Sequence, residues 1–438
     1  MRWNRAETTG WGRALRAAEE IARPENRATL HRLVAETPAP AMGNRRSYGD
    51  AALNHGGRSI DMTRLDRLIG FDPETGILEA EAGATIGEIA RVFAPRGWLP
   101  AVMPGTGFAT LGGAIANDVH GKNHHVAGSF GQHVVAIDLL TPAGRRTLTA
   151  DSDATLWRAT IGGVGQTGVI LSARIRLIPC PSTTMRVRER RIDTLDAFLG
   201  HFEDSDAPYS VGWIDATARG AALGRGIFEE GRIAPHDAGH APGAARRMPL
   251  DAPRALLSGP VVRAFNAVYW RRVPAGGRSV ARPLERFFFP LDRLHDWNRL
   301  YGKPGFHQFQ CVVPPAATDT LREMLDRIGT AGLASPLAVL KRMGPGRAGH
   351  LSFPMEGWTL AVDFPNRAPA RALIAGLEGL ARDAGGRLYL AKDALAAPER
   401  LVGMYPDLPD FAAAAAEVDP AGHFATDLVR RLRLREAT

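Results

Sequence analysis

The first 180 residues alternate between helical and strand-like spacing of apolar positions. Leu30, Leu33 and Val34 recur at helical intervals, and Thr85 stands where it can cap a following helix. Other runs alternate apolar and polar residues or are rich in β-branched residues, as strands are. The pattern predicts helices at 26–36 and 85–93 and strands at 76–83, 134–140 and 168–178.

The composition changes after Pro179 and Pro181, where we place a domain boundary. Beyond it the pattern predicts an α+β domain with strands at 306–313 and 358–364 and helices at 317–331 and 368–384. Within this half, residues 233–280 lack a regular pattern and are rich in Gly, Pro, Ala and Arg, which predicts a mobile surface segment. Its basic, apolar-tipped centre at 246–272 suits either an anionic membrane surface or a loop that covers the active site.

A chain of 438 residues exceeds the usual size of one hydrophobic core, so two domains are expected. Its 54 Lys and Arg against 46 Asp and Glu leave a net charge of +8, which favours anionic partners. The basic residues follow no zinc-finger or RNA-binding pattern, so we expect no nucleic-acid partner. Cys180 and Cys311 are too isolated to build a disulfide framework or a thiolate metal site, and no metal site is expected.

The N-terminal segment contains acidic residues and no apolar core, so no signal peptide is expected. No apolar run approaches the roughly 20 residues that span a bilayer. We therefore expect a cytoplasmic or peripherally membrane-associated protein.

Three glycine-bearing loops occur early in the chain, at 43–50, 104–125 and 162–168. Glycine has no Cβ, so these loops let backbone N–H groups approach an anion closely. The first loop adds Arg45 and Arg46, whose guanidinium groups suit phosphate oxygens. The third lacks the strand-first context of a Rossmann unit. Each loop alone is compatible with a tight turn, but the three together predict a diphosphate-bearing cofactor that lies across several loops.

Three motifs follow one another in a recognisable order: Arg46-Ser-Tyr-Gly-Asp50, Pro104-Gly-Thr with Gly112-Gly-Ala-Ile-Ala116, and Gly162-Gly-Val-Gly-Gln-Thr-Gly-Val-Ile170. In this order they resemble the vanillyl-alcohol-oxidase-like family, whose members carry a PCMH-type FAD-binding domain. Further segments resemble the FAD-containing oxidase subunits of decaprenylphosphoryl-β-D-ribose 2′-epimerases, among them His120-Gly-Lys-Asn-His-His125, Gln308-Phe-Gln310 and Ala391-Lys-Asp393. The likeness runs from about residue 10 to the end and is weakest across 185–285.

This resemblance implies a two-domain α+β flavoprotein. Residues 1–184 and 387–438 would form the FAD-binding domain, and residues 185–386 a substrate domain with a mixed or antiparallel sheet. Many relatives attach FAD covalently through a histidine at the position of Arg46, so we predict that FAD is bound non-covalently here. The implied cofactor-binding residues are Gly43, Arg45, Arg46, Ser47, Tyr48, Gly49, Met62, Pro104, Gly105, Thr106, Thr110, Gly112, Gly113, Asn117, His120, Gly121, Asn123, Gly168, Val169, Ile170 and Tyr389.

The resemblance also implies which residues surround the reacting group. The expected catalytic residues are Lys392, Tyr48, Gln310 and His120, and the expected substrate-binding residues are Lys341, Gln308, Lys122 and Phe288. Gln308 and Gln310 are two positions apart and so share one strand face. Lys392 and Lys341 suit proton acceptance if burial lowers their pKa and phosphate anchoring if it does not, and surface charges remain an alternative.

The implied activity is FAD-dependent oxidation of the 2′-hydroxyl of a polyprenylphosphoryl-pentose to the 2′-keto sugar, in the synthesis of cell-envelope arabinose precursors. A separate NAD(P)H-dependent short-chain reductase would complete the epimerisation. Two alternatives stay open: an alditol or aldonolactone oxidase that acts on free sugars, and an idle flavin-binding subunit of a cell-wall complex. Ala361 stands where some relatives have a flavin-facing cysteine, and Phe288 and Phe289 replace a more polar pair, so the substrate entrance is expected to differ.

Overall fold

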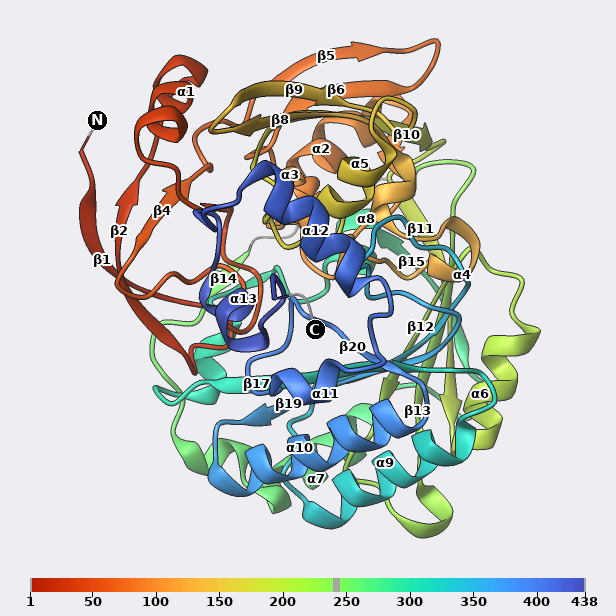
Figure 1. Ribbon diagram of the computed structural model, residues 1–438. Helices are drawn as coiled ribbons and strands as arrows, with labels where there is room; N and C mark the ends of the chain where they lie inside the picture. Colours follow the sequence, from red (N-terminus) through yellow and green to blue (C-terminus); the bar gives the residue numbers. More distant parts are fainter. Residues whose placement is uncertain (1, 239–244, 437–438) are drawn as a thin grey trace.

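The computed structural model describes residues 2–238 and 245–436, and within them the strands form three main sheets and one short parallel pair (Figure 1). The first sheet has the order β1-β2-β4-β3, and the second has the order β5-β6-β10-β8-β9 with β7 paired to β10. Their strands are β1 (Asn4–Thr9), β2 (Arg16–Ala22), β3 (Ala41–Met42), β4 (Arg58–Asp61), β5 (Leu68–Asp72), β6 (Ile77–Glu81), β7 (Trp98–Pro100), β8 (Val134–Thr141), β9 (Gly144–Leu148) and β10 (Val169–Pro179).

The third sheet has eight strands in the order β15-β11-β13-β12-β18-β19-β17-β20, and every neighbouring pair is antiparallel. Its strands are β11 (Thr184–Ile192), β12 (Tyr209–Ile214), β13 (Gly226–Ile233), β15 (Arg278–Pro283), β17 (Phe306–Val313), β18 (Ala338–Met343), β19 (Gly357–Pro365) and β20 (Arg387–Leu388). The short pair is β14 (Arg246–Arg247) with β16 (Leu294–His295).

Thirteen α-helices within the described residues pack around these sheets. They are α1 (Arg27–Glu36), α2 (Ile86–Phe93), α3 (Leu111–Ala116), α4 (His124–Ala127), α5 (Ala154–Thr160), α6 (Leu195–Asp204), α7 (Gly259–Arg271), α8 (Leu284–Phe288), α9 (Thr318–Ala331), α10 (Ala368–Asp383), α11 (Pro398–Leu401), α12 (Leu408–Val418) and α13 (Asp427–Leu432). None of the helices in the described residues is both long and apolar enough to pass through a membrane.

The elements predicted from periodicity are confirmed: they are α1, α2, β6, β8, β10, β17, β19, α9 and α10. The Thr85 hydroxyl caps α2 by accepting the backbone N–H of Glu88 at 3.2 Å. Phe309 and Cys311 on β17 face the core formed with α9 and α10, so the alternate residues Gln308 and Gln310 face the other side of the sheet. Figure 1 shows α9 and α10 on one side of this sheet and the glycine-loop sheets on the other.

One expectation about the chain's organisation needs correction. Residues 233–280 do not lack regular structure, because they contain α7 and the start of β15; residues 239–244 of this segment lie outside the described residues. The domain assignment stays a prediction, and β20, at the beginning of the segment assigned to the FAD-binding domain, pairs with β17 in the eight-stranded sheet. We propose that the domains divide at the start of β11, close to the predicted boundary.

The C-terminal helix α13 ties two site loops together. Arg431 on this helix binds Asp50 at 2.7 Å and Asp393 at 2.9 Å. The loops also meet through their backbones, because the N–H of Tyr48 donates to the carbonyl of Ala391 at 2.9 Å. This contact fixes the position of the neighbouring Lys392 relative to the first glycine loop.

Candidate active site

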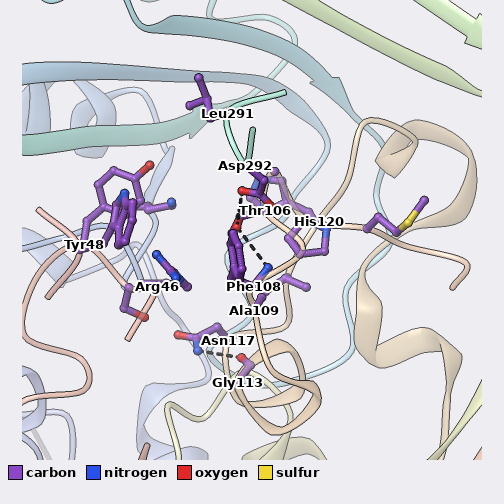
Figure 2. Close-up of a pocket in the computed structure, with 18 of the residues that line it drawn as sticks. Arg46, Tyr48, Thr106, Phe108, Ala109, Gly113, Asn117, His120, Leu291 and Asp292 are labelled. Atoms are coloured by element: carbon purple, nitrogen blue, oxygen red, sulfur yellow. Dashed lines mark hydrogen bonds between the residues drawn. The ribbon is translucent and has the colours of Figure 1, made fainter. Parts of the chain in front are cut away.

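A cavity of about 830 Å³ lies between the glycine loops and the eight-stranded sheet. This volume is typical of pockets that hold a cofactor or a small substrate. Figure 2 shows Arg46 and Tyr48 on one side of the cavity and Thr106 and His120 on the other, with Asn117 at the bottom of the view. The cavity therefore brings together residues from the first two glycine loops.

Arg46 is held between two aromatic rings. Its guanidinium carbon lies 4.1 Å from the ring centroid of Trp11 and 4.6 Å from that of Phe108. Burial lowers the pKa of Arg46, and the nearby carboxylate of Asp292 acts in the opposite direction. The side chain is cationic at any ordinary pH and has no means of forming the covalent flavin bond that a histidine forms at this position.

The second glycine loop packs tightly against its neighbours. The Thr110 hydroxyl accepts the N–H of Gly113 at 3.3 Å at the start of α3. A Cβ added at Gly43 would lie 2.2 Å from the Thr110 hydroxyl oxygen, and one at Gly112 would lie 2.9 Å from the Cβ of Ala82. These glycines are required for close packing of the two loops and of α3 on β6.

Asp292 connects the second glycine loop to the segment that follows α8. Its carboxylate accepts the Thr106 hydroxyl at 2.8 Å (Figure 2) and the Gly107 N–H at 2.7 Å. Burial raises the pKa of Asp292, and these two hydrogen bonds lower it. A residue 186 positions away in sequence thus holds the loop in place.

Several buried polar atoms on the cavity wall have no hydrogen-bond partner in the described part of the chain: Arg45 Nε and Nη2, Arg46 Nε, Asn117 Oδ1 and His120 Nδ1. Leaving such an atom unpaired costs about 1–3 kcal/mol, so a bound group with matching atoms stabilises the site. A Cβ built on Gly105 meets no atom within 4 Å, which leaves open space beside the loop. The guanidinium groups of Arg45 and Arg46, their unpaired N–H donors and the accessible backbone at Gly105 fit FAD, because its diphosphate supplies hydrogen-bond acceptors.

Most of the expected site residues line this cavity, including every expected catalytic and substrate-binding residue. Gly49, Asn123 and Val169 do not. A Cβ at Gly49 would lie 1.9 Å from the Asp393 carbonyl oxygen, so Gly49 allows two loops to meet. Asn123 turns its amide to the carbonyl of Ala101 at 2.8 Å, and Val169 lies buried in β10 between two residues that do line the cavity.

Three of the four lysines in the chain line the cavity: Lys122, Lys341 and Lys392. The fourth, Lys303, is exposed. Arginine stays protonated in proteins, whereas a buried lysine can lose its proton. The cavity thus contains three of the four lysine amines of this protein.

Burial lowers the pKa of each of these amines. It lowers the pKa of Lys392 to about 7, with Asp363 acting to raise it and Lys341 to lower it further. The pKa of Lys341 is also about 7, through burial and repulsion by Lys122. The pKa of Lys122 is about 8, mainly through burial. At neutral pH a proton can therefore move onto or off this cluster at little cost in free energy.

His120 is positioned by Gln310. The amide Nε2 of Gln310 lies 3.2 Å from Nε2 of His120, and the imidazole packs beside the stacked rings of Phe353 and Tyr389. Burial holds the pKa of His120 well below its usual value, so the ring is neutral. With the amide donating to Nε2, the ring proton is on Nδ1, whose hydrogen is free for a bound group.

Asp363 fixes the second glutamine. It is fully buried and accepts hydrogen bonds from the Gln308 amide and from the Tyr301 hydroxyl, the latter at 3.0 Å. Burial raises the pKa of Asp363 to about 7. Asp363 therefore orients Gln308 and is near enough to Lys392 to raise the pKa of its amine.

The lining of the cavity also includes small, aromatic and cationic residues. Ala361, in place of the cysteine of some relatives, lies on β19 opposite Gln310 and lines the cavity. Phe288 also lines it and packs on Tyr209 with ring centroids 5.0 Å apart.

Sequence reasoning missed Trp11, Phe108, Asp292 and Asp363 as site residues, and also four arginines that line the cavity: Arg272, Arg278, Arg282 and Arg286.

A model of the FAD binding domain family matches residues 19–149 of this chain. The chain is 36% identical to the decaprenylphosphoryl-β-D-ribose oxidase of Mycolicibacterium smegmatis, over 97% of both chains. It belongs to this oxidase family. As a member, it is an FAD-dependent oxidoreductase with the two-domain α+β architecture predicted above.

Two further relatives bear on the range of activities. The chain is 37% identical to an uncharacterised protein of Streptomyces coelicolor, over 80% of this chain and 100% of that protein. It is 27% identical to the L-gulono-1,4-lactone dehydrogenase of Mycobacterium tuberculosis, over 45% of this chain and 48% of that protein. Similarity to the lactone enzyme is therefore lower in identity and extent than similarity to the decaprenylphosphoryl-ribose oxidase.

Proposed function

We propose that this enzyme oxidises the 2′-hydroxyl of a polyprenylphosphoryl-pentose to the 2′-keto sugar, as the first half of an epimerisation. Its near full-length similarity to a decaprenylphosphoryl-β-D-ribose oxidase supports the substrate class. The observation that carries the proposal is the gathering of three lysines with lowered pKa in one cavity. Such a cluster suits a substrate that carries both an acidic phosphate and a hydroxyl that must lose a proton.

Lys392 is the proposed proton acceptor. Oxidation of the alcohol breaks its C–H and O–H bonds and forms a carbonyl, so a hydride and a proton must leave together. When bound, FAD takes up the hydride. The neutral amine of Lys392 takes the hydroxyl proton, while Gln310 and the Nδ1–H of His120 hold the oxygen in place. Tyr48 closes the site beside the amine and excludes water.

Lys341 and Lys122 are the proposed partners of the phosphate. In a 1′-phosphoryl sugar the phosphate is attached to the carbon next to the reacting carbon, so its ligands must lie near Lys392. Lys341 perturbs the pKa of Lys392, and Lys122 perturbs that of Lys341, which indicates that the amines are close together. The bound phosphodiester monoanion would raise the pKa of both amines and favour their charged forms.

The test is anaerobic mixing of the purified flavoprotein with a polyprenylphosphoryl-ribose in detergent while the visible absorbance of the flavin is followed. We expect bleaching with the lipid-linked sugar and none with xylitol or an aldonolactone. Bleaching by the free sugars alone would support the lactone-oxidase alternative, and no bleaching by any of them would support the idle flavin-binding subunit.

The proposed product is a ketone that needs a hydride from another enzyme to complete the epimerisation. An NAD(P)H-dependent short-chain reductase is therefore the proposed partner. Of the two expected locations, a lipid-linked substrate favours peripheral contact with the membrane.

A further inference from the structure

Exposed apolar side chains gather in one short segment of the chain. The described residues expose eight large apolar side chains, and five of them are Leu250, Leu256, Val261, Phe265 and Val268. Their exposed fractions range from 42% to 73%. Monomeric proteins seldom concentrate apolar residues in this way unless the surface binds something. We call these five residues the apolar stripe.

The helix that carries most of the stripe is fixed to the domain by its other face. Val262 and Asn266 on α7 are buried, and the Asn266 amide donates to Asp215 at 2.7 Å. Val261, Phe265 and Val268 follow at intervals of four and three, so they share the outward face. The stripe is thus held outward by a packed helix.

The stripe continues into the active-site cavity. Phe265 stacks on Tyr269 with ring centroids 5.8 Å apart, and Tyr269 packs on Trp213 at 4.7 Å. Tyr269 and Trp213 both line the cavity. One helix therefore exposes an apolar surface on the outside and forms part of the cavity wall on the inside.

The unpaired charge around the stripe is positive. Within residues 250–284, Asp251 is the single acidic residue and is paired with Arg13 and Arg299, and there are six arginines. Of these, Arg254, Arg263 and Arg271 are exposed and form no ion pair with any described residue. Unpaired arginines beside an apolar helix face complement the anionic headgroups and acyl region of a bilayer.

We propose that the apolar stripe and its arginines dock on a bilayer that contains anionic lipid. Docking places the cavity next to the membrane, so a polyprenyl chain can stay in the bilayer while its sugar enters the site. This purpose rests on the proposed function, but membrane binding itself is measured without turnover. The occupant is the lipid surface and not a second copy of the chain, because a symmetric pair would bring the unpaired arginines against each other.

The experiment is co-sedimentation of the holoenzyme with phosphatidylcholine vesicles that contain or lack phosphatidylglycerol. We expect binding to the anionic vesicles, and a loss of about tenfold or more in Val261→Ser/Phe265→Ser/Val268→Ser. The triple variant Arg254→Gln/Arg263→Gln/Arg271→Gln should lose binding in the same way. The matched control Ile69→Ser/Val402→Ser removes exposed apolar groups elsewhere and should bind like the unmodified enzyme.

Absence of binding to anionic vesicles, or equal binding by the stripe variant, overturns the inference. Light scattering that shows a dimer, converted to a monomer in the stripe variant, also overturns it in favour of self-association. Flavin bleaching by detergent-dispersed lipid sugar separates this inference from the proposed function. Vesicle binding without bleaching leaves the membrane inference intact and contradicts the proposed function. Bleaching without vesicle binding supports the proposed function and overturns the membrane inference.

Discussion

The amine of Lys392 lies 3.5 Å from the ring centroid of Tyr48 on the wall of the cavity. The ring face attracts a cation, whereas burial disfavours one and is the largest cause of the lowered pKa. The pair therefore keeps an amine near its titration point with its position fixed. A proton acceptor beside a flavin needs both properties.

Replacing Lys392 by Met should leave the protein yellow and slow the reduction of its flavin by about 10²-fold or more, since a general base contributes at least that much. Anaerobic stopped-flow absorbance measures the rate. Lys303→Met is the matched control, because Lys303 is the exposed lysine outside the cavity. Flavin reduction at the normal rate in the Lys392 variant would remove this residue from proton transfer.

The rate of flavin reduction should rise with pH around 7. Lys392 has a pKa of about 7 and accepts a proton only when neutral, so its active fraction increases from pH 6 to pH 8. Lys341 and Lys122 bind phosphate best when protonated, and their pKa values are about 7 and 8. The KM should therefore rise from about pH 7 upward, while kcat levels off above pH 8. A kcat that falls between pH 6 and 8 would contradict the assignment.

Lys341→Met should stabilise the FAD-free protein at pH 7 while weakening substrate binding. The pKa of Lys341 is lowered in the folded state, so the unfolded chain binds more protons between about pH 7 and 10 and stability rises with pH across that window. Methionine removes the buried amine and flattens this dependence. Differential scanning calorimetry should show a Tm higher by about 2 °C or more at pH 7. An unchanged pH slope would show that Lys341 is not the group responsible.

Asp292→Ala should weaken FAD binding by about tenfold, because Thr106 and Gly107 lose the acceptor that positions their loop. Fluorescence of FAD released on dilution measures its dissociation. Asp383→Ala is a suitable control, since its carboxylate is exposed and pairs with the adjacent Arg382. Equal FAD affinity in the two variants would show that the hydrogen bonds from Thr106 and Gly107 to Asp292 do not support cofactor binding.

Acid denaturation should release the flavin into the supernatant. Arg46 stands at the histidine position of covalent relatives and is stacked between Trp11 and Phe108, so no covalent link is expected there. Absorbance of the supernatant and of the washed pellet decides the matter. Yellow colour that stays with the precipitated protein would overturn this prediction.

Local patterns were enough to predict the glycine loops and the elements around them. Gln308 and Gln310 could be placed on one face because strand alternation is a local property. The hydrogen bonds of Asp292 to the second glycine loop could not be predicted in this way, since the fold alone brings that residue to Thr106. The resemblance already placed Lys122, Lys341 and Lys392 at the site, and the scarcity of lysine, four in 438 residues, is a second sequence signal for their convergence.

Helix α7 shows why periodicity failed across 233–280. Its buried face is narrow and includes the polar Asn266, whereas Val261, Phe265 and Val268 point outward. Apolar residues on both faces hide the helical period. Gly49 is a related case, because its motif predicted cofactor contact, but the space it leaves is filled by the carbonyl of Asp393.

Because lysine is scarce, chemical labelling of its amines would report directly on the cavity of this protein. Apart from the chain's terminal amine, an amine-directed tag has Lys303 and the three cavity lysines as its targets. Mass spectrometry of the tagged chain would therefore record, residue by residue, how far the cavity is open and which amine a ligand shields. Most enzymes need an engineered label to give that information, and here the native sequence supplies it.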